Sequence, residues 1–133
     1  MNSVTLRVTI LGVLLLAAFS CSKEEAGVET RIIGIWRLTE KVVDQVPAAL
    51  SECELASTLE FQENNLCVLL DGCTNKITNS GWNYRYDMLN ISVQLPAAYY
   101  IEKLDGESLV IRRQDITTDG NLMVSVLTYI KID

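Results

Sequence analysis

The most restrictive feature of this sequence is the alternation of apolar and polar side chains in several short segments. The clearest example covers residues 89–95, and residues 82–86 and 122–132 repeat the pattern. Successive side chains of a β-strand point to opposite faces, so a period of two predicts half-buried strands. The alternating apolar residues are Trp82, Tyr84, Tyr86, Leu89, Ile91, Val93, Leu95, Leu122, Val124, Val126, Ile130 and Ile132.

Turn-forming residues separate the candidate strands, as at Asp71-Gly72, Asn79-Ser80-Gly81, Asp105-Gly106 and Asp119-Gly120. Short connections of this kind imply an antiparallel up-and-down meander, and eight strands can close into a barrel that leaves no exposed edge. We therefore expect an all-β fold, with residues 47–55 as either a short helix or an extended loop. The eight strands are expected over residues 33–44, 55–62, 65–71, 80–86, 88–95, 98–104, 107–114 and 121–132.

The first twenty residues differ from the rest of the chain. Residues 1–20 contain a single charge, Arg7, and an almost unbroken apolar run from Val8 to Phe19. This run is shorter than the roughly 20 apolar residues that a membrane-spanning helix needs. The small Ser20 follows it and precedes a cysteine. These features predict a cleavable secretory signal peptide over residues 1–20.

The segment Leu16-Ala17-Ala18-Phe19-Ser20-Cys21 resembles the lipobox of Gram-negative lipoproteins, in which the cysteine sulfur is acylated before cleavage. The resemblance implies that Cys21 carries lipid, and the alternative is an ordinary signal peptide cut nearby. Ser22 at the next position implies sorting to the outer membrane. The acidic pair Glu24-Glu25 resembles an export signal to the cell surface, so we expect an outer membrane lipoprotein that is exposed there. Residues 21–31 are then a lipidated cysteine and a flexible acidic tether, or the tether acts only as a spacer.

The composition argues against several functions. The chain has 17 acidic and 11 basic residues, so clustered cations for nucleic acid phosphates are missing. It has no histidine, which excludes a Ser-His or Cys-His nucleophile pair within one subunit, and it has no phosphate-cradling glycine loop. Without histidine or a C-x-x-C pair, a zinc site is also disfavoured. We expect no enzymatic activity, no metal, no cofactor and no nucleic acid partner.

Several segments resemble, in order and spacing, the lipocalin-like domains of small Gram-negative lipoproteins. The resemblance covers residues 32–133 and implies that this region is a small lipocalin-like barrel domain. In that family the glycine corresponding to Gly34 allows close backbone approach, and the tryptophan corresponding to Trp36 plugs the closed end. The indole is expected beneath Arg112, Arg113 or Lys131. The matching segments are Ile33-Gly34-Ile35-Trp36-Arg37-Leu38, Cys53, Ser57-Thr58-Leu59-Glu60-Phe61, Gly81-Trp82-Asn83-Tyr84, Leu89-Asn90-Ile91, Tyr99-Tyr100-Ile101 and Leu109-Val110-Ile111.

Three cysteines remain once Cys21 is assigned to the lipid. In an oxidising compartment, Cys53, Cys67 and Cys73 leave one disulfide and one odd thiol. The family resemblance implies the pair Cys53 and Cys73, with Cys67 as a small buried hydrophobe. The alternatives pair Cys67 with either of the other two.

The expected function is binding of a small, partly apolar ligand at the cell envelope, because an eight-stranded barrel is just wide enough to hold one. Candidate ligand-lining residues are Tyr84, Tyr86, Tyr99 and Tyr100, which combine apolar faces with polar tips. The alternative is a solid barrel that docks onto another envelope or surface protein. The interior volume distinguishes a ligand-binding barrel from a solid one, since large residues at every inward position would fill the barrel.

Overall fold

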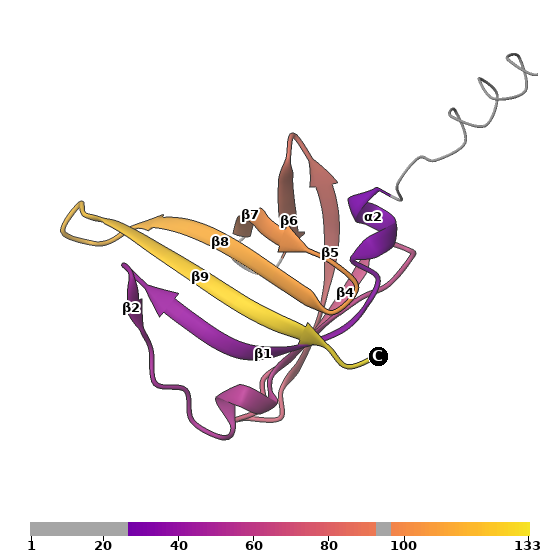
Figure 1. Cartoon of the computed structure of the whole chain (residues 1–133), viewed down its shortest axis with the longest axis horizontal. Coiled ribbons are helices and arrows are strands. Elements are labelled where there is room, and N and C mark those ends of the chain that lie inside the picture. The colour runs from indigo at the N-terminus through magenta and orange to yellow at the C-terminus, as the bar shows by residue number, and fades with distance from the viewer. Residues whose placement is uncertain (1–26, 93–96) are drawn as a thin grey trace, which may run out of the picture.

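The computed structural model describes residues 27–92 and 97–133 as one closed antiparallel β-barrel (Figure 1). Eight of the nine strands follow one another around the barrel, and β9 pairs back onto β1 to close it. This confirms the predicted all-β meander. The elements are α2 (Val28–Arg31), β1 (Gly34–Val43), β2 (Val46–Pro47), the 3-10 helix η1 (Glu54–Ala56), β3 (Thr58–Phe61), β4 (Leu66–Leu70), β5 (Ile77–Arg85), β6 (Met88–Ser92), β7 (Ala97–Leu104), β8 (Ser108–Ile116) and β9 (Leu122–Lys131).

One predicted turn is wrong, and the structure decides between the two alternatives expected for residues 47–55. The residues Asn79-Ser80-Gly81, expected as a turn, lie inside β5, and β4 and β5 are joined by the turn at residues 71–76, which begins at the predicted Asp71-Gly72. Asp71 stabilises this turn, because its carboxylate accepts hydrogen bonds from the backbone N–H groups of Cys73 and Thr74. Residues 47–55 are mostly extended loop, since β2 ends at Pro47 and η1 begins only at Glu54.

The N-terminal part of the described chain is also more ordered than a tether. Val28–Arg31 form the short helix α2, although the sequence predicted a flexible tether over these residues. The Arg31 guanidinium donates a hydrogen bond to the Leu104 carbonyl, with 3.1 Å between Nη1 and O. The next residue, Ile32, is fully buried. Within the residues that the structure covers, no helix is long and apolar enough to cross a membrane.

The hydrophobic core fills the closed end of the barrel, where β1 begins and β9 ends. Phe61 and Trp82 meet edge to face there, with 5.4 Å between their ring centroids. Such pairs contribute about 0.5–1.5 kcal/mol beyond the area that they bury. The buried apolar residues are Ile32, Trp36, Leu59, Phe61, Cys67, Trp82, Leu89, Ile91, Leu109, Ile111 and Tyr129.

Trp36 occupies the place that the family resemblance implied. Its ring is fully buried, and its Nε1–H donates to the Ile32 carbonyl at 2.8 Å. Of the three basic residues expected above the indole, Lys131 is the one that lies there, with its Nζ 5.9 Å from the ring centroid. The other two cations lie over tyrosines, Arg112 over Tyr100 and Arg113 over Tyr99.

The inward face of the last strand is the reverse of the one that the alternation suggested. Leu38 of β1 pairs with Tyr129, and Ser125 and Tyr129 are the buried residues of β9. Val124 and Val126 therefore lie on the outer face, where Val126 pairs with Val42. Both faces of β9 carry apolar residues, so a period of two could not identify the inner one.

Gly34 is one position where a side chain has no room. Its φ is +140°, and a Cβ there would lie 2.6 Å from Lys131 Cε and 2.7 Å from the Asp133 carbonyl oxygen. We expect Gly34→Ala to lower the free energy of unfolding by about 1–3 kcal/mol, the usual cost of a strained backbone position. Urea denaturation measures this. Gly106→Ala is the control, because a Cβ at Gly106 meets nothing within 4 Å. If Gly34→Ala and Gly106→Ala lost equal amounts of unfolding free energy, this would contradict the view that Gly34 has no room for a side chain.

Candidate functional site

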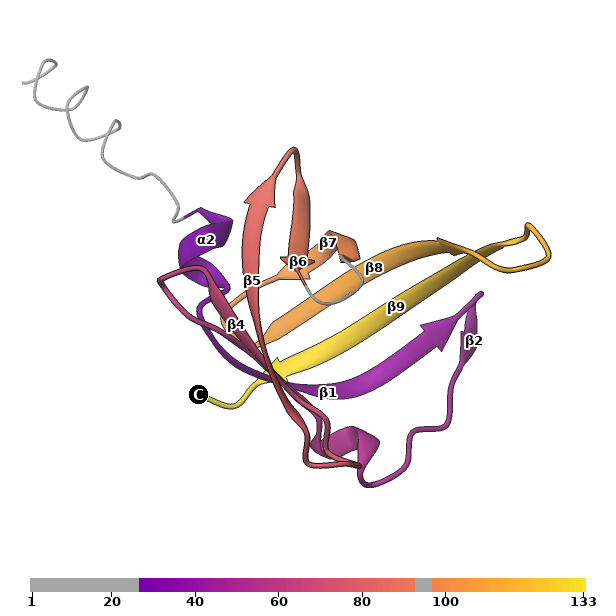
Figure 2. The same cartoon turned by 180° about the vertical axis from the view of Figure 1, so that it is seen from behind.

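The barrel opens at the end opposite Trp36, because β1 separates from β3 there. β1 pairs with β3 only over Gly34 to Arg37, and its upper part pairs with β2 and β9. The last bond between the two sides joins the Leu38 N–H to the Ser57 carbonyl. Figure 2 shows β1 and β2 turning away from β4 on the far side of this point. The separation leaves a cavity of about 410 Å³.

Cross-strand pairing explains why this cavity is mainly apolar. Leu59 pairs with Leu69, and Leu69 pairs with Thr78, so these side chains share the inner face of β3, β4 and β5. Leu38 and Tyr129 form the facing pair on β1 and β9. The complete lining is Leu38, Ser57, Thr58, Leu59, Leu69, Leu70, Asp71, Lys76, Thr78 and Tyr129.

Polar groups in the lining fall into two classes. Asp71 and Lys76 are exposed and lie in the turn between β4 and β5, at the rim. Tyr129, in contrast, is only 7% exposed. Burial raises the pKa of Tyr129 above its ordinary value of 10.0, and the neighbouring Tyr99 and Cys67 add to the rise. The phenol is therefore uncharged at neutral pH.

The polar side chains of this wall leave no buried atom unsatisfied, since no buried side-chain nitrogen or oxygen atom in the described part of the chain lacks a hydrogen-bond partner. The Ser57 hydroxyl oxygen, for example, accepts a bond of 3.0 Å from the Gly72 N–H.

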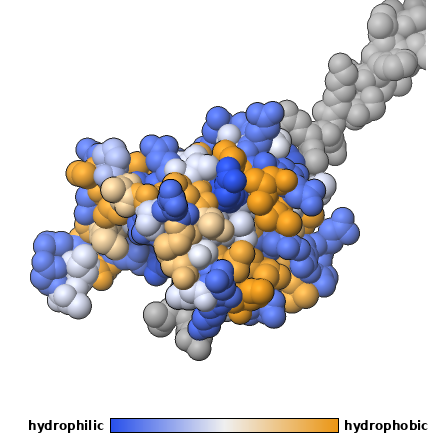
Figure 3. Space-filling model, turned by 90° about the horizontal axis from the view of Figure 1, so that it is seen from below, coloured by the Kyte–Doolittle hydropathy of each residue, from blue (hydrophilic) through white to orange (hydrophobic). Residues whose placement is uncertain are grey.

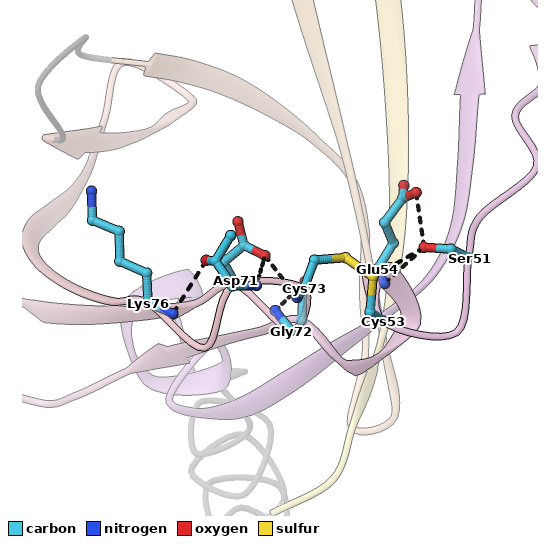
Figure 4. Close-up of a disulfide and its surroundings, with 9 residues drawn as sticks. Ser51, Cys53, Glu54, Asp71, Gly72, Cys73 and Lys76 are labelled. Carbon is cyan, nitrogen blue, oxygen red and sulfur yellow. Dashed lines mark hydrogen bonds between the residues drawn. A yellow bond between two sulfur atoms is a disulfide. The ribbon is translucent and has the colours of Figure 1, made fainter.

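A disulfide holds the rim of the cavity. Cys53 and Cys73 are bonded, with 4.6 Å between their Cα atoms, which confirms the predicted pair. Figure 4 shows how the bond joins the η1 segment to the turn after β4. On the η1 side, the Ser51 hydroxyl bonds the Glu54 carboxylate at 3.0 Å. The disulfide therefore ties η1 to this turn beyond the point where the β3–β4 ladder ends at Thr58 and Leu70.

Gly72 fits this arrangement because it lies against the η1 segment. A Cβ at Gly72 would collide with the Cys53 carbonyl oxygen and with Ala56. The adjacent Asp71 carboxylate accepts the backbone bonds from Cys73 and Thr74, and these bonds lower its pKa. The turn is thus shaped by a glycine, a carboxylate and a disulfide together.

Two further depressions lie on the outside of the barrel. One, of about 650 Å³, is bounded by Arg37, Thr39, Glu52, Leu55 and Ile132 and is the more open to solvent. The other, of about 310 Å³, lies among Val42, Asp44, Gln45, Val124 and Val126 on the outer face of β1 and β9. We take the cavity lined by Tyr129 as the candidate site, because its lining includes the buried core residues Leu59 and Tyr129, whereas the linings of the other two include no buried residue.

None of the four predicted ligand-lining tyrosines contributes to this cavity. Tyr84 and Tyr99 face the interior but pack against the core. Tyr86 is 94% exposed in the turn between β5 and β6, and Tyr100 is on the outer face under Arg112. For Tyr86 and Tyr100 the prediction is wrong, because the strand ends before Tyr86 and because Tyr99 and Tyr100, as neighbours in a strand, point to opposite faces.

Cys67 is the free thiol, and it is fully buried in the core below the cavity. Burial, helped by the charge of Glu60, raises the pKa of Cys67 to about 12. Since the thiolate is the reactive form, we expect Cys67 to resist alkylation in the folded state, at least about a thousandfold at pH 8. The measurement is iodoacetamide labelling of the mature chain with Cys21→Ser, before and after unfolding in guanidinium. Rapid labelling of the folded chain would contradict the buried position.

Within the described part of the chain, no three Cys, Asp or Glu side chains form a group that suits a metal ion. The site itself consists of apolar walls, the buried Tyr129 and the two rim charges of Asp71 and Lys76.

Comparisons with known proteins agree with this geometry. A solved structure of bovine odorant-binding protein with undecanal aligns with 84% of this chain and 77% of its own, at a TM-score of 0.51 and 13% identity. Odorant-binding protein OBP1 aligns with 81% of this chain and 76% of its own, at a TM-score of 0.52 and 13% identity. Aphrodisin, a sex pheromone from female hamster, aligns with 77% of this chain and 76% of its own, at a TM-score of 0.50 and 7% identity. At such identities the likeness shows the fold alone.

No curated protein matches the sequence. The sequence profile of the lipocalin-like domain matches residues 32–111, which is more than half of the chain. The matched region runs from the buried Ile32 through the disulfide and the cavity walls on β3, β4 and β5 to Ile111 in β8. This chain therefore belongs to the lipocalin-like domain family.

Proposed function

We propose that this protein binds a small, partly apolar ligand in the open end of its barrel and acts at the cell envelope without enzymatic chemistry. The cavity of about 410 Å³ carries the proposal. The apolar part of its lining is formed by Leu38, Leu59, Leu69 and Leu70, so entry of an apolar ligand removes hydrophobic surface from water at about 25 cal/mol per Å². A cavity of this size and composition is typical of small-molecule sites. The similarity of the fold to that of bovine odorant-binding protein, whose structure was solved in complex with undecanal, supports the same proposal.

The proposal includes a lipid anchor at the outer membrane. Cys21 lies outside the described residues, and the support comes from the lipobox resemblance and the apolar run before it. Several acyl chains would hold the barrel to the membrane, since each buried methylene contributes about 0.8 kcal/mol. Radiolabelled palmitate should enter the wild-type chain in its host but not Cys21→Ala. Equal labelling of both would contradict the anchor.

Filling the cavity tests the binding function. Thr78 is half-buried on the inner face of β5, so Thr78→Phe places an aromatic ring in the cavity. We expect this variant to bind the fluorescent reporter N-phenyl-1-naphthylamine at least about tenfold more weakly, which corresponds to about 1.4 kcal/mol. Asn79→Phe is the matched control, because Asn79 follows Thr78 in the same strand and therefore points outward, where it is exposed.

Fluorescence titration of the three chains measures these affinities. Loss of binding in both variants would indicate unfolding, which circular dichroism detects. Undiminished binding in Thr78→Phe would show that the reporter binds elsewhere and would contradict the proposed site.

The exposed apolar residues outside the barrel favour a second candidate function, docking onto an envelope protein. Ile116 and Leu122 form a cross-strand pair at the end of the β8–β9 hairpin and are 78% and 59% exposed. Val46 of β2 is also exposed. Figure 3 shows hydrophobic areas divided by hydrophilic ones on the face seen from below, so this view presents no single continuous apolar surface. The interior cavity keeps ligand binding first.

A further inference from the structure

We propose that the outer face of β9 is an interface at which two copies of this chain meet, related by a two-fold axis parallel to β9. This inference goes beyond the binding function and rests on the proposed lipid anchor at Cys21. It assigns the exposed apolar residues of β8 and β9 to a second copy of the chain and not to another envelope protein. None of the interface residues named below lines the cavity.

A strip of branched apolar side chains runs along the outer face of β9. Leu122, Val124 and Val126 follow one another at a spacing of two, so they share this face. The neighbouring strands, which lie on either side of β9 (Figure 1), continue the strip. Ile116 of β8 pairs with Leu122, and Val42 of β1 pairs with Val126. Since Ile116 and Leu122 are 78% and 59% exposed, this end of the strip is open to a partner.

The strand pairing decides how a partner can approach the strip. β9 is hydrogen-bonded to β1 on one side and to β8 on the other, so a partner cannot extend the sheet at β9 by adding a strand. It must pack face to face. Two sheets that pack in this way keep their strands within about 30° of each other and interdigitate the side chains of the facing surfaces. The same apolar face of a second copy meets this requirement.

A two-fold axis parallel to β9 places β1 of one copy against β8 of the other, and the shapes of these two flanks are complementary. On the β1 flank, a depression of about 310 Å³ lies among Val42, Asp44, Gln45, Val124 and Val126. On the β8 flank, the exposed Ile116 lies two residues beyond Gln114, which pairs with Val124. Rotation about this axis preserves height along the strand, so Ile116 of each copy faces the depression of the other. A two-fold interface requires such a self-complementary surface.

The charges on the two flanks are complementary as well. The β1 flank carries Glu40 and Asp44, and Asp44 is held in place because its carboxylate accepts a bond of 2.8 Å from the Val124 N–H. The β8 flank carries Arg112, which pairs with Val126 at the same height as Val42. The rotation therefore brings Arg112 of one copy between Glu40 and Asp44 of the other. Glu102 accepts the Arg112 Nε–H, and a guanidinium has five N–H donors, so it can pair with a second carboxylate.

The proposed anchor agrees with this axis. A rotation about an axis parallel to β9 leaves the closed ends of both barrels, where α2 leads into β1, pointing the same way, so both copies can be anchored in one membrane. An axis perpendicular to β9 would point the two closed ends in opposite directions. Tethering two binding partners raises their effective concentration to about the millimolar range, so an interface of only three strands suffices at the membrane. In dilute solution the same interface should be weak, because small interfaces bind weakly.

Disulfide cross-linking in host membranes tests the interface. A residue near a two-fold axis meets its own counterpart, so the lipidated chain with Val124→Cys should form a dimer on oxidation with copper phenanthroline. Tyr86→Cys is the control for random collisions, because Tyr86 is 94% exposed and lies in the turn between β5 and β6. Because the interface holds the two copies together, we expect Val124→Cys to give at least about five times more dimer than Tyr86→Cys on a non-reducing gel.

A second substitution tests the contact of Ile116. In the Val124→Cys chain, Ile116→Asp places a charge in the apolar interface and should reduce the dimer at least about fivefold. Ile77→Asp is the matched control, because Ile77 is 63% exposed but belongs to β5, and it should leave the dimer unchanged. Both substitutions are at exposed positions, and circular dichroism verifies that both variants fold. The same cross-linking of the soluble chain with Cys21→Ser at roughly 1 mM, the effective concentration of a tethered pair, separates the interface from the anchor.

The outcomes distinguish the two proposals. Equal dimer from Val124→Cys and Tyr86→Cys, or no dimer from Val124→Cys either in membranes or at high concentration, would overturn the interface and leave ligand binding untouched. Dimer in concentrated solution but not in membranes would support the interface and contradict the proposed anchor. A cross-linked product of Val124→Cys with another protein in place of the dimer would overturn the second copy and favour an envelope protein.

Discussion

Replacing Trp36 by alanine should lower the free energy of unfolding by about 3–5 kcal/mol, the largest effect expected of any single substitution in this barrel. The indole is fully buried, so its removal leaves a cavity at the closed end. It also removes the bond of 2.8 Å to the Ile32 carbonyl and the ring beneath Lys131. Since small domains are stable by only about 5–15 kcal/mol, this loss is a large fraction of the total stability. Urea denaturation measures the loss.

A second variant of Trp36 and a control variant show which part of the indole stabilises the barrel. Trp36→Phe keeps most of the apolar volume but deprives the Ile32 carbonyl of its donor, which costs about 1–3 kcal/mol. Tyr86→Ala is the control, because Tyr86 is 94% exposed and should change stability by less than about 0.5 kcal/mol. A similar loss in Tyr86→Ala and Trp36→Ala would be incompatible with the closed end described above.

Removing the disulfide should have the second-largest effect. The bond closes a loop with a sequence separation of 20, so the double variant Cys53→Ala, Cys73→Ala should lose roughly 3 kcal/mol of unfolding free energy. Ligand affinity should fall as well, because the bond joins η1 to the turn that carries Asp71 and Lys76 at the cavity rim. Thermal unfolding followed by circular dichroism measures the first effect, and reporter titration measures the second.

Reduction provides the internal control. Dithiothreitol should lower the melting temperature of the wild-type domain and leave that of the double variant unchanged, since Cys67 forms no bond that can be reduced. If the reductant destabilises both equally, the disulfide is not the cause.

Much of the fold followed from the sequence. The alternating segments predicted β6 well, and the turn residues Asp105-Gly106 and Asp119-Gly120 correctly placed the connections on either side of β8. Local patterns of this kind suffice because strand pairing along a meander is mostly between neighbours in sequence. The family resemblance supplied Gly34, Trp36 and the pair of Cys53 with Cys73, none of which periodicity alone defines.

The site was harder to predict, because it depends on where β1 leaves β3. That point sets which side chains border an opening, and no local pattern marks it. Tyr129 illustrates the difficulty, since both faces of β9 carry apolar residues and the alternation pattern favoured the wrong one. One available signal was missed. Tyr99 and Tyr100 are adjacent in a strand, so they cannot both point into the barrel.

The most direct test of the binding function is an NMR titration of the mature chain with Cys21→Ser, labelled with ¹³C at leucine and valine methyl groups. Adding N-phenyl-1-naphthylamine should shift the methyl signals of Leu38, Leu59, Leu69 and Leu70, which line the cavity. The signals of Val124 and Val126, on the outer face of β9, should stay in place. Shifts confined to Leu122, Val124 and Val126, with the cavity leucines unchanged, would contradict an interior ligand site and favour the outer surface instead.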